Sequence, residues 1–127
     1  MTQKIAITIA FLTGLGMMFI GARFLLSPEI AEAGYGIHFN EHGDYSFHYI
    51  KGIRDVFTGL LICILIITRQ RKALGTLLAV GTIIPVVDMI IVLSKDYNGI
   101  TQAIPHISAI IVCAVSGTIL LMRKTSV

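Results

Sequence analysis

Four apolar segments, each about as long as a membrane-spanning helix, most constrain what this chain can fold into. They run from about Ile5 to Leu26, Phe47 to Thr68, Leu74 to Leu93 and Ile100 to Met122. A helix of about 20 apolar residues crosses the ~30 Å hydrocarbon core of a bilayer. Backbone groups in hydrocarbon must bond within their own segment, and these segments lack the alternation of a barrel strand. The sequence therefore predicts an all-α bundle of four transmembrane helices, a single domain over residues 1–127.

The composition supports a membrane protein. Of the 127 residues 55% are hydrophobic and 13% are charged, whereas about 25% are charged in an ordinary soluble domain. Such a chain has too little polar surface to cover a water-soluble globule, which excludes a soluble enzyme and a nucleic-acid-binding module. The expected partner is the lipid bilayer, with no nucleic acid and no cofactor. Two cysteines are too few for a disulfide scaffold, and we expect both to be unpaired thiols.

The basic residues predict the topology. They fall at the head of the chain, in the second connection and in the tail: Lys4; Arg69, Arg71 and Lys72; Arg123 and Lys124. In a four-span chain these regions share one side, and the positive-inside rule places that side in the cytoplasm. We therefore expect a multi-pass protein of the cell membrane with both termini cytoplasmic and the acidic connection Ser27–Ser46 outside.

A cleavable signal peptide is the competing interpretation of the first segment. Ala31-Glu32-Ala33 resembles a cleavage site, but the apolar run Ile5–Ile20 exceeds the usual apolar region of about 7–15 residues. We therefore expect the first helix to be retained.

Small residues recur along the segments and predict packing faces, because helices in lipid associate where their backbones can approach. They are Ala10 and Gly14, Gly75 and Ala79, and the stripe Ala109, Cys113 and Gly117. From sequence these faces could equally contact a second copy of the chain.

Ionisable residues gather at one depth in the outer part of the spans. Counted from the outer helix ends at 1.5 Å per residue, one level contains Arg23, Lys51, Arg54, Asp55, Asp88 and His106. Charges within a membrane are costly and by default mark function. They are tolerated when they face the bundle interior and pair, so we expect a polar, charged pocket here.

Helical spacing predicts how these groups pair. Lys51 and Asp55 share a face of their helix, and His48 extends that face. The fork of Arg54 suits Asp88 as a bidentate partner, which leaves one positive charge over. Pro85 should kink the third span and free a carbonyl near Asp88. The outer connection supplies a lid: Tyr35, His38, Asn40, His42, Tyr45 and Tyr49.

Each of these groups also has a purely structural interpretation. Arg23 alone could be a snorkelling anchor, and Tyr45 and Tyr49 are typical of an interfacial belt. His38 and His42 lack a third ligand of diagnostic spacing, so no metal site is expected. Asp55 and Asp88 could form ion pairs whose role is only to stabilise the packing of the helices.

Several short motifs carry a resemblance to a known family. They are Tyr35-Gly36-Ile37, Lys51-Gly52-Ile53-Arg54-Asp55 opening the second span, Pro85 followed by Asp88, and His106 early in the fourth span. Over nearly the whole chain the sequence resembles a family of small four-helix membrane proteins known as a domain of unknown function. In size and layout it is more distantly similar to DoxX-like proteins. The resemblance implies the four-helix fold and the membrane location but no activity.

Three functions remain open from the sequence. In the first, the pocket holds the head of a small amphiphilic or anionic ligand, with Arg23, Tyr35, His48, Lys51, Arg54, Asp55, Asp88 and His106 as candidate binding residues. In the second, the protein is a membrane isomerase or cyclase in which Asp55 or Asp88 is the acid or base, helped by His106. In the third, it is an accessory subunit whose polar layer is structural.

Overall fold

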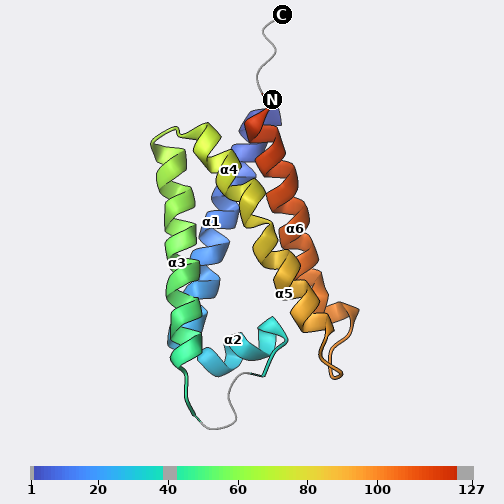
Figure 1. Ribbon diagram of the computed structural model, residues 1–127. Helices are drawn as coiled ribbons and strands as arrows, with labels where there is room; N and C mark the ends of the chain where they lie inside the picture. Colours follow the sequence, from blue (N-terminus) through green and yellow to red (C-terminus); the bar gives the residue numbers. More distant parts are fainter. Residues whose placement is uncertain (1, 39–42, 123–127) are drawn as a thin grey trace, which may run out of the picture.

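The computed structural model describes residues 2–38 and 43–122, and within these ranges the fold is all-α (Figure 1). Its helices are α1 (Thr2–Leu26), α2 (Pro28–Tyr35), α3 (Ser46–Ile67), α4 (Arg71–Gly81), α5 (Ile83–Leu93) and α6 (Ile100–Leu121). The four apolar segments of the sequence are therefore helical. Arg123 and Lys124 of the tail, and Asn40 and His42 of the expected lid, lie outside the described residues.

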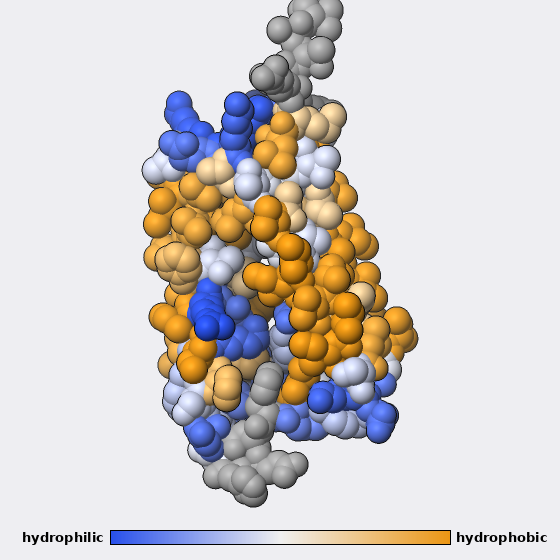
Figure 2. Space-filling view, in the orientation of Figure 1, coloured by the Kyte–Doolittle hydropathy of each residue, from blue (hydrophilic) through white to orange (hydrophobic). Residues whose placement is uncertain are grey.

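Three stretches of helix are long and apolar enough to cross a membrane: Thr2–Leu26, Arg71–Leu93 and Ile100–Leu121. α3 has 22 residues and is long enough to cross a membrane. It carries three charged residues, however, so its composition alone does not identify it as a membrane span. Large apolar side chains are exposed along the outer faces of the helices, for example Phe19 at 64% and Phe57 at 63%. Figure 2 shows them as a broad hydrophobic band between hydrophilic ends. Such a surface suits lipid rather than water.

Paired glycines bring α1 and α3 into close antiparallel contact. A Cβ atom on Gly59 would lie 2.4 Å from the carbonyl oxygen of Gly14, and one on Gly21 would lie 2.5 Å from that of Gly52. Each helix thus offers two glycines seven residues apart to the other. Because only glycine permits this approach, the two backbones pack almost directly on each other.

Of the predicted small-residue faces, those of Ala10 with Gly14 and of Gly75 with Ala79 pack within the chain, as does Gly117 of the third. A Cβ atom on Gly117 of α6 would lie 2.7 Å from the backbone nitrogen of Ala79 in α4, and Gly75 packs on the same stretch of α6. Ala10 is fully buried in a core with Ile62, Leu74, Leu78 and Leu120. This core closes the end of the bundle where α1 begins and α6 ends (Figure 1).

The third apolar segment is divided at Thr82 into α4 and α5. Pro85 has no N–H to donate to the carbonyl of Gly81, four residues earlier, which breaks the hydrogen-bond ladder there. The expected disturbance by Pro85 is therefore present. α5 continues along α6, and Figure 1 shows it diverging from α3 toward the end that α2 covers.

The outer connection contains a helix where the sequence analysis expected only a connecting segment. Pro28 occupies the first turn of α2 and Gly36 ends it in the left-handed conformation at φ 88°. The side chain of Asn98 donates to the carbonyls of Gly36 (2.5 Å) and Val92 (2.9 Å). α2 is thus tied to the α5–α6 loop and crosses the open end of the bundle.

Candidate functional site

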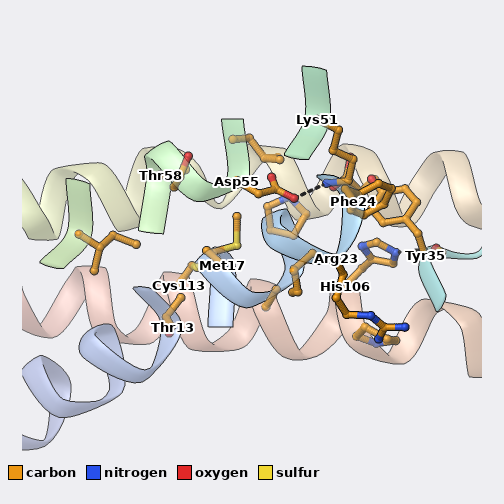
Figure 3. A pocket seen from close by; sticks show the side chains of 18 of the residues that line it. Thr13, Met17, Arg23, Phe24, Tyr35, Lys51, Asp55, Thr58, His106 and Cys113 are labelled. Carbon is orange, nitrogen blue, oxygen red and sulfur yellow. Dashed lines mark hydrogen bonds and ion pairs between the residues drawn. The ribbon is translucent and has the colours of Figure 1, made fainter. Parts of the chain in front are cut away.

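A cavity of about 360 Å³ lies between the two helix pairs, α1–α3 and α4/α5–α6, beneath α2. The part of the cavity away from α2 is lined by apolar or weakly polar side chains, among them Met17, Ile62, Leu77 and Cys113. The part beneath α2 carries the polar groups Arg23, Tyr35, Lys51, Asp55 and His106 (Figure 3), and Asp88 also lines the cavity. The cavity is therefore amphipathic, with apolar walls and one polar end.

The structure brings together six of the eight residues that the sequence put forward as a binding site. α1 supplies Arg23, α2 Tyr35, α3 Lys51 and Asp55, α5 Asp88 and α6 His106. They come from five helices because the helical rise places their positions at a similar level. The other two residues, His48 and Arg54, are not among the cavity-lining residues.

Lys51 and Asp55 form an ion pair on the wall of α3. Lys51 Nζ lies 2.8 Å from Asp55 Oδ2, as the spacing of four predicts. The same ammonium group lies 5.0 Å from the ring centre of Phe24 and 4.7 Å from that of Tyr35. Cation–π attraction to two rings holds the lysine at the polar end of the cavity.

Tyr35 links the lid helix to α5 and α6. Its hydroxyl lies near the Asp88 carboxylate, and its ring meets that of His106 edge-on at 5.0 Å. His106 Nε2 lies 3.4 Å from the Tyr35 carbonyl oxygen, which requires a hydrogen on Nε2 because a carbonyl only accepts. Burial, and then the neighbouring Asp88 carboxylate, raise the pKa of Tyr35 well above its ordinary value. The tyrosine therefore remains a neutral donor.

The expected pairing of Arg54 with Asp88 is wrong. Arg54 is exposed on α3, and within the described residues it forms no ion pair. Helical geometry points the Arg54 side chain about 100° away from Asp55. Because α5 diverges from α3, Asp88 does not pair with Arg54. The lining charges are then Arg23 and Lys51 against Asp55 and Asp88. The cavity layer is balanced, and the surplus positive charge lies outside it.

Arg23 is half-buried on the wall from α1. In the described part of the chain no ion pair or hydrogen bond engages its guanidinium group. It is thus a cavity-lining cation without an ion-pair partner in this part of the chain, whereas Lys51 pairs with Asp55.

His48 belongs to a second cluster that fastens α2 to α3. Its Nε2 lies 2.7 Å from Glu32 Oε2, and both side chains are buried, at 1% and 8% exposed. The ring of Tyr45 packs edge-on against His48 at 5.4 Å, and the Tyr45 hydroxyl donates to Glu29. On the other side of Glu32, His38 Nδ1 is 3.7 Å from Oε1. The expectation that His48 extends the Lys51 face toward the surface is wrong, because the glutamate draws it under the lid.

Two important residues were missed from sequence: Glu32 and Phe24. Glu32 was counted only among the charges of the outer connection. The signals for α2 were present, since Ser27-Pro28-Glu29 is typical of a helix start and Gly36 of a helix end. Nothing in the spacing distinguishes Phe24, which contacts Tyr35, His48 and Lys51, from a residue facing lipid.

The fold and its apolar surface define a helical membrane protein with a polar-ended cavity. The chain belongs to the family described as Domain of unknown function (DUF4267), whose family model matches residues 14–120. No curated protein matches the chain significantly, and no solved structure does.

Proposed function

We propose that the protein crosses the cell membrane four times and binds the polar head of a small amphiphile in the outer half of its bundle. The single observation that carries this proposal is the cavity itself, polar at one end and apolar along its walls. Its volume of about 360 Å³ falls within the range of about 300–1,000 Å³ typical of small-molecule sites.

The fourth span in this proposal is α3. Its charged residues Lys51 and Asp55 face the cavity as a pair rather than lipid, which removes much of the cost of placing them in a membrane. With α3 across the bilayer, the ends of the chain and the basic α3–α4 turn share the cytoplasmic side. α2 then lies on the outer surface.

The polar end offers both kinds of hydrogen-bonding group. Arg23 and Lys51 donate, whereas Asp55 and Asp88 accept. Because the four formal charges balance, the layer suits a head that both donates and accepts, such as a hydroxyl or a carboxyl group. The tail would follow the apolar wall toward Met17 and Cys113.

Blocking the cavity tests the proposal. Ala109 lines the cavity, whereas Ile111 on the same helix is 58% exposed on the outer face. Ala109→Phe narrows the cavity without removing a polar group, and Ile111→Phe is its matched control. Native mass spectrometry should find a bound small amphiphile on the wild type and on Ile111→Phe, but not on Ala109→Phe. If all three proteins carry the same amount of bound lipid, that lipid is annular and does not occupy the cavity.

A membrane isomerase or cyclase is the second candidate, and the Tyr35–Asp88 contact favours it. A carboxylate, a phenol held neutral and an imidazole, His106, line one end of an apolar cavity. Acid–base chemistry on a lipophilic substrate needs such groups within hydrogen-bond reach. Turnover of apolar substrates by wild type and Asp88→Asn decides this candidate, and unchanged turnover would remove Asp88 from the mechanism.

The accessory-subunit alternative has less support. The Lys51–Asp55 pair lies within one helix and joins no two helices. The Glu32–His48 pair does join two helices, α2 and α3, but it lies apart from the cavity.

A further inference from the structure

The opening of the cavity lies between α3 and α5. Lys51, Asp55 and Thr58 of α3 form one side of it, and Ile84 and Asp88 of α5 form the other. Ile84 lines the cavity yet is 62% exposed. α3 and α5 share few contacts, since α5 packs on α6 and α3 on α1. Figure 2 shows hydrophilic side chains in a hollow flanked by hydrophobic surface.

Arg54 lies at the rim of this opening. Viewed along the axis of α3, Arg54 lies between Thr58, which lines the cavity, and Ile50 and Phe57, which face outward. The side chains of Ile50 and Phe57 are 44% and 63% exposed. Its side chain therefore leaves the helix where the polar wall meets the lipid-facing surface. Thr58 donates to the Arg54 carbonyl, so the two positions are adjacent along the wall.

The charge of Arg54 has no counterion within the described residues. The nearby cation Lys51 is satisfied by Asp55 at 2.8 Å, and α5 carries no cation. An exposed arginine within a membrane span is costly, and an anion from outside the chain that meets it lowers this cost. Its fork is suited to a carboxylate or a phosphate.

We propose that Arg54 is the selectivity residue of a lateral entrance between α3 and α5 and binds the anionic group of a single-chain amphiphile arriving from the bilayer. This inference rests on the proposed function and adds the ligand's charge and route. The water side is covered by α2, which is tied to α3 at its middle through Glu32 and to the α5–α6 loop at its C-terminal end through Gly36. A cavity of about 360 Å³ is at the small end of ligand sites, which suits one chain rather than the two of a phospholipid.

Photo-crosslinking in phosphatidylcholine nanodiscs tests this inference. The probes are a diazirine-bearing single-chain alkyl phosphate, the alcohol of the same chain, and a diazirine phosphatidylglycerol. In the wild type we expect the alkyl phosphate to label cavity peptides about tenfold more than the alcohol, the ratio for one charge-assisted hydrogen bond. Arg54→Gln should bring that ratio close to one, whereas Arg54→Lys should retain part of it.

Two controls separate the possible outcomes. Lys72→Gln removes an exposed cation from the other end of the bundle and should leave the ratio unchanged. Arg23→Gln tests the cation inside the cavity. If Arg23→Gln abolishes the preference for the alkyl phosphate and Arg54→Gln does not, the inference is overturned.

The inference is also overturned if phosphatidylglycerol labels the entrance and displaces the single-chain probe. Labelling of the cavity by the alcohol alone would leave the proposed function standing, whereas no cavity labelling by any probe would contradict both.

Discussion

Gly59 and Gly14 meet backbone to backbone: a Cβ atom on Gly59 would stand 2.4 Å from the Gly14 carbonyl oxygen. The second pair, Gly21 and Gly52, repeats this contact one heptad away. The α1–α3 unit is thereby held as one wall of the cavity. Its rigidity gives Lys51, Asp55 and Phe24 a fixed arrangement.

Gly59→Ala should destabilise the bundle, because the added methyl group would clash with the backbone of α1, which cannot move away as a side chain could. Overpacking of this kind costs about 1–3 kcal/mol. Gly16→Ala on α1 is the matched control, since nothing lies within 4 Å of its Cβ position. Thermal unfolding in detergent should show a lower midpoint for Gly59→Ala alone. Equal midpoints for both variants would contradict the close packing.

The Glu32–His48 contact should hold the lid. Glu32→Gln and His48→Gln each leave a buried polar partner poorly satisfied, which costs about 1–3 kcal/mol. Limited proteolysis should therefore cut near α2 faster in either variant, while the transmembrane helices stay protected. In a double-mutant cycle the two effects should be less than additive because they remove one interaction. Full additivity would show that the residues act separately.

Tyr35 should resist ionisation. Since burial and Asp88 raise its pKa in the folded protein, folding favours the protonated phenol. This contribution to stability is complete below the ordinary tyrosine pKa of about 10 and is lost as the pH rises toward the folded-state value. The phenolate absorbance difference between wild type and Tyr35→Phe should thus stay flat through pH 10. An earlier rise in that difference, with the fold intact, would contradict the buried contact.

Site-directed cysteine labelling tests the four-span topology and the place of α3. In a background of Cys63→Ala and Cys113→Ala, single cysteines replace Asp44, Lys72 or Asp96, which lie in or beside the three connections. A membrane-impermeant maleimide should label Asp44→Cys and Asp96→Cys in intact cells. Lys72→Cys should react only after permeabilisation. Labelling of Asp44→Cys and Lys72→Cys from one side would rule out α3 as a span.

The sequence predicted the helices well because their signal is local. A run of about 20 apolar residues specifies a helix wherever it lies in lipid, and the common level of Asp55, Asp88 and His106 follows from the helical rise. The Lys51–Asp55 pair was equally predictable, since both residues lie on one helix.

The contacts between elements could not be predicted in this way. The direction of Arg54 was fixed, but its partner depends on where α5 lies, and Pro85 and the α5–α6 contact determine that. Glu32 and His48 are 16 residues apart across a loop, and no periodicity connects them. α2 itself was readable from its Pro28 start and Gly36 end, and was overlooked because its segment is short and polar.

A density map of the protein purified with its native lipids tests the central claim most directly. The account predicts elongated density between α3, α5 and α6, with its polar end within hydrogen-bond distance of Lys51, Asp88 or His106. The contrary result is an empty cavity in which α3 closes against α5 and the ionisable groups pair only with one another.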